Sequence, residues 1–140
     1  MFEQFTDKAK KVMLLANIQA HKYNYEFLTP ECLFLGLLGE GYGIGVKILW
    51  KLGIDLQQAQ FEIEKQMQTE PGILRANQPP PDPVTKRIIE SAIAEARAVK
   101  HNDVGTEHLL LGLILAKDTV PAQLLEFFGV TAEKVRELLH

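Results

Sequence analysis

The chain has 140 residues, of which 46% are hydrophobic, and carries 15 lysines and arginines against 18 aspartates and glutamates, for a formal net charge of −3. This length and apolar content are typical of one globular domain, and the charge balance, which leaves no broad basic face, argues against nucleic acid as a main partner. The single cysteine, Cys32, excludes an internal disulfide. Residues 1–5 lack the regions of a signal peptide, and no apolar run approaches the ~18 residues of a membrane span, so we expect a soluble cytoplasmic protein.

The apolar pattern is helical from the first residues onward. Thr6 or Asp7 is expected to cap a first helix, in which apolar residues recur at three- and four-residue spacing. Residues 23–26 are expected to form its exit and a loop. Thr29 then provides an N-cap, and Pro30 stands at the first helical position, where its missing N–H costs nothing.

Residues 30–38 form a short predicted helix that is apolar on nearly all sides, so we expect it to be central and buried. The glycine-rich residues 39–43 are expected to end it. A phosphate-binding loop is excluded here, because no Gly-Lys-Ser/Thr follows and no strand precedes. We therefore expect a flexible turn, with no ATP site and no other cofactor.

Two further helices complete the first half of the chain. A third helix over about residues 44–52 is expected to stop at Gly53, a favourable residue just after a helix end. Asp55 is expected to cap a fourth helix that runs to about Met67.

The second half of the chain repeats the first. Residues 5–64 align with residues 81–140 at a constant offset of 76 without a gap, and ten of the 60 aligned positions are identical. The identities cluster in a Glu-x-Leu-x-Leu-Gly-Leu motif at residues 31–37 and 107–113. Such an internal repeat decides the architecture, because each copy builds the same structural unit.

The capping signals also recur in the second copy, with different residues. Asp82 replaces Thr6 as the first cap, Gly105 replaces Thr29, and Gly129 with Thr131 repeats the helix stop and new cap. Different residues thus supply the same caps and stops at corresponding positions, which supports the repeat independently of the ten identities.

These patterns predict a single domain over residues 1–140 with an all-α fold of two pseudo-twofold-related four-helix repeats. Repeat 1 covers about residues 1–68 and repeat 2 about residues 82–140. The linker between them, about residues 69–81, contains several prolines and is expected to be extended. Because a unit of about 60 residues is marginal alone, the two copies are expected to share one core.

No pattern of residues indicates catalysis or a metal site. The histidines, His21, His101, His108 and His140, form no metal-binding pair by spacing, and Cys32 is expected to be a core residue on a buried helix. No acid/base pair with enzyme-like spacing is present. A small helical enzyme with an unrecognised site stays as the alternative from another class.

Four residues are candidates for binding. Glu31 and Glu107 each stand in the first turn of the apolar helix of their copy, where a carboxylate stabilises the helix by about 0.3–1 kcal/mol. Alternatively they bind a guanidinium, whose planar fork matches a carboxylate, while an attached anion meets the free N–H groups of the helix start. Phe2 and Phe5, ahead of the first cap, either pack in the core or form a hydrophobic docking surface.

Three segments resemble a known family. Residues 105–113, Gly-Thr-Glu-His-Leu-Leu-Leu-Gly-Leu, resemble the repeat signature of the Clp N-terminal domain, the substrate-receiving module of Clp-type AAA+ unfoldases. Residues 1–12 and 39–49 are similar to the corresponding segments of the ClpC branch. The resemblance covers essentially the whole chain.

This resemblance implies a non-catalytic module that binds unfolded or marked substrate proteins and adaptors for an ATP-driven ring and its protease. It also implies that the two helix starts recognise phosphorylated arginine. Thr106 and Glu107 match the family's site fully, whereas in the first copy Glu31 matches but Thr29 and Pro30 stand where Gly and Thr are expected. Proline removes a donor N–H and a hydroxyl able to hold a phosphate, so we expect the second site to be the functional one.

Two arrangements of such a protein stay open. The chain is either the N-terminal domain of a ClpC-like unfoldase or a free-standing Clp accessory protein that docks on the ring without binding phosphoarginine. In both cases we expect protein partners, no nucleic acid and no membrane, and an isolated domain that is monomeric.

Overall fold

The computed structural model describes residues 2–75 and 77–139, so that Met1 and His140, the ends of the predicted domain, lie outside the described residues. The described residues form eight helices and no strand, which confirms the predicted all-α fold. The helices are α1 (Asp7–Lys22), α2 (Pro30–Glu40), α3 (Ile44–Lys51), α4 (Leu56–Glu64), α5 (Pro83–Ala98), α6 (Thr106–Leu115), α7 (Val120–Phe127) and α8 (Ala132–Leu139).

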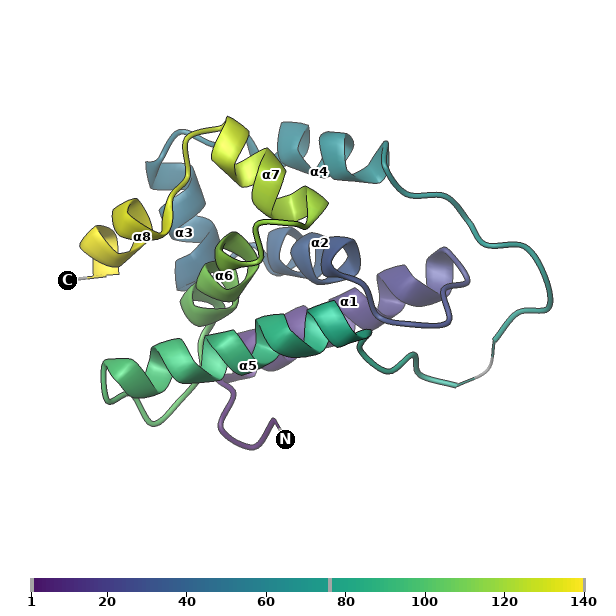
Figure 1. The fold of residues 1–140 in the computed structure, drawn as a ribbon, viewed down its shortest axis with the longest axis horizontal. Coiled ribbons are helices and arrows are strands. Elements are labelled where there is room, and N and C mark those ends of the chain that lie inside the picture. Colours follow the sequence, from purple (N-terminus) through teal and green to yellow (C-terminus); the bar gives the residue numbers. More distant parts are fainter. Residues whose placement is uncertain (1, 76, 140) are drawn as a thin grey trace.

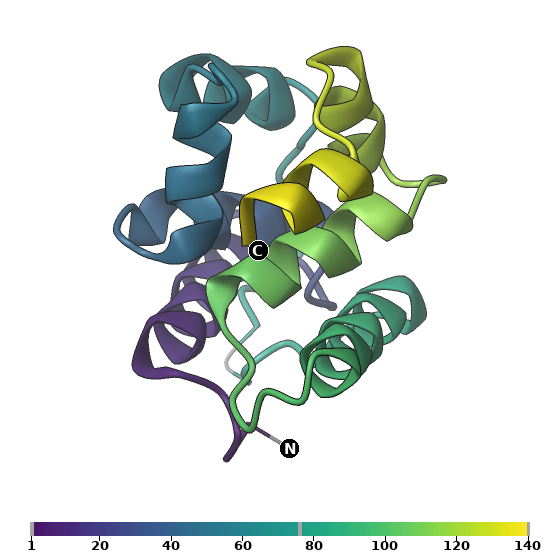
Figure 2. The same ribbon diagram turned by 90° about the vertical axis from the view of Figure 1, so that its left-hand side faces the viewer.

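The two central helices, α2 and α6, carry the repeated motif. Each packs against the long first helix of its own repeat, α1 or α5, while α4 and α7 lie on the opposite side and α3 and α8 at one end (Figures 1 and 2). Every residue of α6 except Leu115 is buried, and so is every residue of α2 except Glu31 and Gly39. The predicted central and buried position of residues 30–38 is therefore confirmed.

Glycines in the repeated motif allow these close helix pairs. A Cβ atom added to Gly36 would lie 2.4 Å from the carbonyl oxygen of Val12, and one added to Gly112 would lie 2.5 Å from that of Ile88. Val12 and Ile88 are themselves counterparts in the repeat. The same glycine thus brings two helix backbones into contact in both copies.

The repeats are joined by two reciprocal contacts. Phe5 forms an isolated parallel bridge with Val104, and Leu28 forms one with Pro81. Phe5 corresponds to Pro81 in the repeat, and Leu28 corresponds to Val104. Each bridge is therefore the counterpart of the other, which is the signature of a pseudo-twofold axis between the copies.

The predicted caps are observed. The side-chain oxygens of Thr6, Thr29, Asp55 and Asp82 accept hydrogen bonds from backbone N–H groups two or three residues further on, over 2.7 to 3.3 Å. Gly105 is the N-cap of α6, as expected, and has no side chain to accept such a bond.

Two helix ends differ from the prediction. Helix α2 continues through Gly39 to Glu40 and ends at Gly41, which adopts a left-handed conformation with φ 77°. Helix α4 ends at Glu64 rather than near Met67, because the following N–H groups form tighter bonds three residues back, Met67 to the carbonyl of Glu64 at 3.1 Å.

The segment between the repeats is fixed to the end of α1. It runs from α4 around the outside of the molecule to α5 (Figure 1). Asn24, with φ 56°, donates from Nδ2 to the carbonyl of Glu70 over 3.2 Å, and its Oδ1 accepts from the N–H of Arg75 over 3.1 Å. One buried amide side chain thus orders the extended linker.

Among the described helices, no single one is long and apolar enough to cross a membrane, and two sharply bent helix pairs reach the required length and composition only when combined.

Candidate functional site

The start of α6 holds a buried carboxylate. Glu107 is 7% exposed, and a Cβ atom on Gly105 would lie only 2.0 Å from its Oε1, so the side chain folds back over the glycine cap. Within the described part of the chain, this carboxylate has neither a hydrogen-bond donor nor an ion-pair partner. A carboxylate with no partner in the fold is available to a cationic ligand, and a guanidinium matches its two oxygens.

A cleft of about 290 Å³ opens beside this carboxylate. Its walls come from the starts of α1, α3 and α6, which are distant in sequence. Its lining includes Asp7, Lys8, Lys47, Gly105, Thr106 and Glu107.

The cleft carries charges of both signs. Lys8 and Lys47 are exposed, and neither forms an ion pair with another described residue. The N–H groups of Thr106 and Glu107, in the first turn of α6, have no hydrogen-bond acceptor among the described residues. Lysines and a helix N-terminus attract an anion, whereas the Glu107 carboxylate attracts a cation. The arrangement suits a ligand that combines both charges.

The hydroxyl of Thr106 is bonded to a helix of the first repeat. Thr106 is 2% exposed, and its Oγ1 accepts a hydrogen bond from the N–H of Gly45 in α3 over 2.9 Å. The side chain therefore contacts α3, while the backbone N–H of the same residue belongs to the helix start.

His108 completes the start of α6. The N–H of Gly105 donates to its Nδ1 over 2.9 Å, so the proton of the neutral ring is on Nε2, which lies 3.4 Å from Nδ1 of His101. Burial lowers the pKa of His108, and the neighbouring His101 lowers it further, against the opposing effects of Glu107 and Glu95. His108 had no role in the sequence prediction, although its place three residues after the N-cap is that of a capping-box acceptor.

The corresponding helix start in the first repeat has different chemistry. The hydroxyl of Thr29 accepts from the N–H of Cys32 over 3.3 Å and donates to its Sγ over 3.2 Å, so it is used within α2. Glu31 is half-buried, and its pKa is raised by burial and by the nearby Asp82 carboxylate.

The lysines of the cleft have no cationic counterparts around Glu31. By the offset of the repeat, Val84 corresponds to Lys8 and Gln123 to Lys47. The first helix start therefore keeps the carboxylate and lacks both lysines of the cleft.

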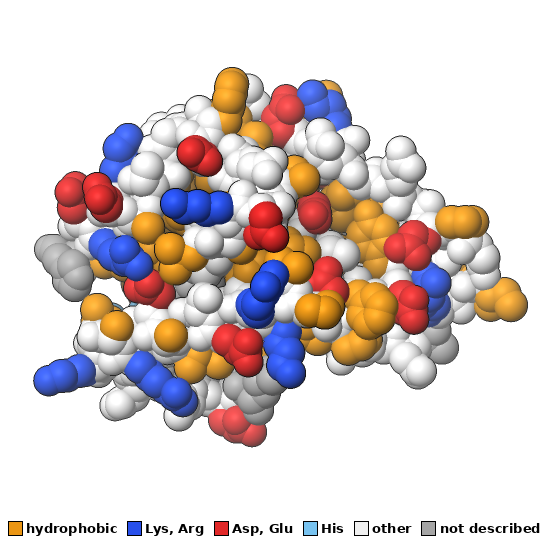
Figure 3. Space-filling view, in the orientation of Figure 1, with side chains coloured by type: hydrophobic (Ala, Val, Ile, Leu, Met, Phe, Trp, Pro, Cys, Tyr) orange, Lys and Arg blue, Asp and Glu red, His pale blue; other side chains and the backbone are white. Residues whose placement is uncertain are grey.

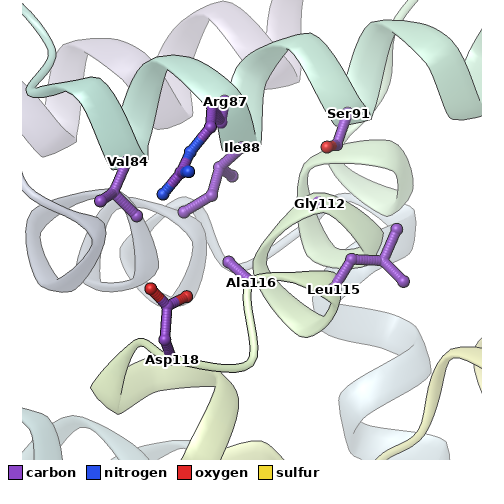
Figure 4. A pocket seen from close by; sticks show the side chains of 8 residues that line it. All are labelled: Val84, Arg87, Ile88, Ser91, Gly112, Leu115, Ala116 and Asp118. Atoms are coloured by element: carbon purple, nitrogen blue, oxygen red, sulfur yellow. The ribbon is translucent and has the colours of Figure 1, made fainter.

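A second cavity, of about 270 Å³, lies between α5 and the end of α6 (Figure 4). Arg87 and Asp118 face each other across it, over an apolar floor that includes Val84 and Ile88. No ion pair between Arg87 and Asp118 is formed. The carboxylate of Asp118 and the nearby C-terminal end of α6 oppose an anion, so this cavity does not suit a phosphate group.

The two N-terminal aromatic residues are in contact. The rings of Phe2 and Phe5 are 4.9 Å apart in an edge-to-face arrangement. Phe5 is only 4% exposed and belongs to the core, whereas Phe2 is partly exposed and packs against the core from outside. Any docking surface here is therefore provided by Phe2, with Phe5 behind it.

The described residues include neither a metal-binding cluster nor an exposed cysteine. No group of three or more His, Cys, Asp or Glu side chains is arranged to hold a metal ion in the described part of the chain. Cys32 is buried, and burial raises the pKa of its thiol. On the face shown in Figure 3, acidic and basic side chains are interspersed rather than gathered by sign.

Residues 4–126 and 82–140 match the family model of the Clp repeat N-terminal domain. The chain belongs to the Clp repeat N-terminal domain family. The resemblance read from residues 105–113 is thereby confirmed.

Relatives of this Clp N-terminal domain are much longer proteins. It is 46% identical over 136 residues to an ATP-dependent Clp protease ATP-binding subunit, a ClpA homolog of Cyanidium caldarium, across 97% of this chain and 16% of that protein. It is 42% identical over 136 residues to the chloroplastic chaperone protein ClpC1 of Oryza sativa subsp. japonica, across 97% of this chain and 15% of that protein. The chain thus spans about one sixth of the length of these curated relatives.

Solved structures share the fold of this Clp N-terminal domain. The N-terminal domain of ClpD from Arabidopsis thaliana superposes with a TM-score of 0.74 at 20% identity, over 96% of this chain and 91% of that one. The N-domain of ClpV from Vibrio cholerae gives 0.82 at 14% identity, over 97% and 82%. At these identities the match supports the architecture, and the site must be argued from this chain's own residues.

Proposed function

We propose that this domain is the substrate- and adaptor-binding module of a ClpC-like ATP-dependent unfoldase and protease system, and that it recognises arginine-phosphorylated proteins at the start of α6. The similarity to Clp ATP-binding subunits and ClpC chaperones supports the general role. The observation that carries the finer proposal is the unpartnered Glu107 carboxylate in the same cleft as Lys8 and Lys47. The module itself performs no reaction, and the ring and protease are its partners.

The chemistry of phosphoarginine matches this cleft. Its guanidinium group pairs with the Glu107 carboxylate, as a planar fork does with two carboxylate oxygens. Its phosphate meets the open N–H groups of Thr106 and Glu107, together with the Lys8 and Lys47 ammonium groups. Neither half of the ligand needs a residue that is occupied elsewhere in the fold.

The first repeat has a lesser role in this proposal. Thr29 and Glu31 occupy the equivalent helix start, but the Thr29 hydroxyl is bonded to Cys32, and the Asp82 carboxylate lies near Glu31. A dianionic phosphate is repelled there. We therefore assign phosphoarginine binding to the second repeat alone.

Adaptor proteins are assigned to a separate place on the same domain. Phe2 presents a partly exposed ring backed by the buried Phe5. An apolar aromatic ring on a rigid support is typical of a protein-docking surface. Replacing Phe2 with alanine is expected to weaken adaptor binding without changing phosphoarginine binding.

Calorimetric titration with a phosphoarginine peptide, and with the same peptide unmodified, tests the proposal. Glu107→Gln is expected to weaken binding of the modified peptide about tenfold or more, since a charged hydrogen-bonding partner is lost from a buried position. Glu31→Gln is the matched control, because it makes the same change at the other helix start, and less than about a twofold change is expected.

Two results would reject the assignment. Absence of binding by the parent domain would favour a Clp accessory role without phosphoarginine. Equal losses in Glu107→Gln and Glu31→Gln would show that the two helix starts contribute alike. Circular dichroism of each variant separates a lost contact from a lost fold.

A further inference from the structure

The start of α3 is capped by residues from outside the helix. Gly43 is its N-cap and offers no side chain. Instead, the N–H of Gly45 donates to Thr106 Oγ1 over 2.9 Å, and the N–H of Gly43 donates to Glu40 Oε1 over 2.8 Å. A third N–H, that of Tyr42, donates to Glu40 Oε2 over 3.2 Å. One cap therefore comes from the end of α2 and the other from the second repeat.

These contacts are closely packed and shielded from water. Glu40 and Thr106 are each 2% exposed. A Cβ atom on Gly43 would lie 2.5 Å from Thr106 Oγ1 and 2.8 Å from Glu40 Oε1, and one on Gly45 would lie 2.8 Å from the Thr106 carbonyl oxygen. The starts of α3 and α6 are therefore in contact at Gly43 and Gly45, where a larger side chain would not fit.

The second repeat lacks this device. Its corresponding helix, α7, is capped by its own Thr119, whose Oγ1 accepts from the N–H of Ala122 over 3.3 Å. Pro30 and Ala116, the counterparts of Thr106 and Glu40, have no side-chain acceptor to offer. Of these two counterpart helices, α3 takes a cap from the other repeat and carries Lys47 into the cleft, whereas α7 does neither.

We infer that Thr106 and Glu40 are positioning residues, which hold α3 against α6 so that Lys47 faces Glu107 across the cleft. The Thr106 hydroxyl then acts through Lys47 and does not contact the ligand. The inference rests on the proposed phosphoarginine site, and it deepens that proposal by assigning part of the anion recognition to the placement of one helix.

A double-mutant cycle with the phosphoarginine peptide tests the coupling. Thr106→Val is nearly isosteric and removes the acceptor, and it is expected to weaken binding about five- to tenfold in the parent. In a Lys47→Gln background the same change is expected to cost less than about twofold, because the group that α3 positions is already absent. Thr106→Ser, which keeps the acceptor, is expected to restore affinity. An equal loss in both backgrounds would overturn the inference, since it would mean direct contact between Thr106 and the ligand.

Amide hydrogen exchange in the ligand-free domain provides a readout that does not depend on the proposed function. Thr106→Val is expected to accelerate exchange at Gly45 by about tenfold or more, while Thr119→Val, the matched cap change at α7, leaves Gly45 unaffected. Unchanged exchange at Gly45 in Thr106→Val would reject the capping role even if the peptide binds. If the parent fails to bind the peptide but Gly45 responds as expected, the phosphoarginine assignment fails and the capping of α3 by Thr106 stands.

Discussion

Phe5 in the first repeat pairs with Val104 in the second, and the backbone bonds of this pair run in both directions. The N–H of Val104 donates to the carbonyl of Gln4 over 2.7 Å, and the N–H of Thr6 donates to the carbonyl of Val104 over 2.9 Å. The entry to α1 is thus ordered by the other copy. Neither copy contains all the partners that its own first helix needs.

Separated repeats are therefore expected not to fold. Residues 1–68 and residues 80–140, expressed apart, each lose the partners of both bridges and expose the buried faces of α2 or α6. Circular dichroism should report little cooperative unfolding for either half alone, and recovery of a cooperative transition on mixing. Cleavage of the intact domain at the exposed Ile73 and Leu74 is the control, and the nicked domain should stay folded. A cooperative transition in one isolated half would show that the repeats are independent.

Because α5 and α6 approach closely at Gly112, alanine at this glycine and alanine at Gly39 are expected to change the stability of the domain in opposite directions. Gly112→Ala is expected to destabilise the domain by about 1–3 kcal/mol, because the new methyl group meets the Ile88 backbone. Gly39→Ala is the matched control. It places a methyl group 3.5 Å from Leu15 Cδ1, an ordinary contact, and is expected to stabilise by about 0.5–1 kcal/mol through helix propensity. Denaturant unfolding measures the free energy of unfolding of both variants. A change of the same sign in both would contradict the close contact between Gly112 and the Ile88 backbone.

Local signals made the helices predictable. The side chains of Thr6 and Asp82 accept hydrogen bonds from N–H groups only three residues further along the chain. Donor and acceptor therefore lie in one short stretch of sequence, where the cap can be recognised. The predicted end of α2 at residue 38 is two residues short. Several glycines follow one another there, and the left-handed conformation of Gly41 decides which one stops the helix. The end of α4 depends on tight turns after Glu64, and no single residue in the sequence indicates these turns.

The cleft could not be read from the sequence, because its parts are far apart in the chain. Glu107 was identified from its motif, but Lys8 and Lys47 reach it only through the packing of the two repeats. Thr106 shows the same limit. The hydrogen-bond partner of its hydroxyl oxygen is Gly45, in a helix of the other repeat, and nothing in the motif at residues 105–113 indicates this contact.

Two counterpart residues have a positive φ, and this conformation predicts how glycine at each position changes the stability of the domain. Lys100, with φ 59°, and Asn24, with φ 56°, occupy the same position after the first helix of each repeat. A lysine is strained in this conformation and a glycine is not, so Lys100→Gly is expected to stabilise the domain by about 0.5–1 kcal/mol.

Asn24→Gly separates conformation from hydrogen bonding at the other copy. It keeps the backbone conformation but removes the bonds to Glu70 and Arg75, so it is expected to destabilise by about 1–2 kcal/mol. Thermal unfolding of both variants measures the difference. Stabilisation by both glycines would mean that the Asn24 side chain contributes nothing to anchoring the linker.

The start of α6 predicts a pH dependence of stability. Nδ1 of His108 accepts the N–H of Gly105, which requires a neutral ring, and the groups that act on it are His101, Glu107 and Glu95. Burial lowers the pKa of His108 in the folded domain, whereas an unfolded histidine titrates near about 6.5. As the pH falls from about 6.5 towards the lowered folded value, the unfolded chain takes up a proton that the folded one does not, so the free energy of unfolding decreases.

His108→Gln tests this pH dependence, because a glutamine three residues after the N-cap offers an uncharged acceptor to the N–H of Gly105. Urea unfolding at a series of pH values from about 5 to 8 should show a shallower acid decline for His108→Gln than for the parent. His21→Gln, at a solvent-exposed histidine in the last turn of α1, is the comparison variant, and it should change the acid decline less than His108→Gln does. Parallel curves for the parent and His108→Gln would mean that the acid sensitivity of the domain arises elsewhere, and that protonation of His108 does not compete with the cap of α6.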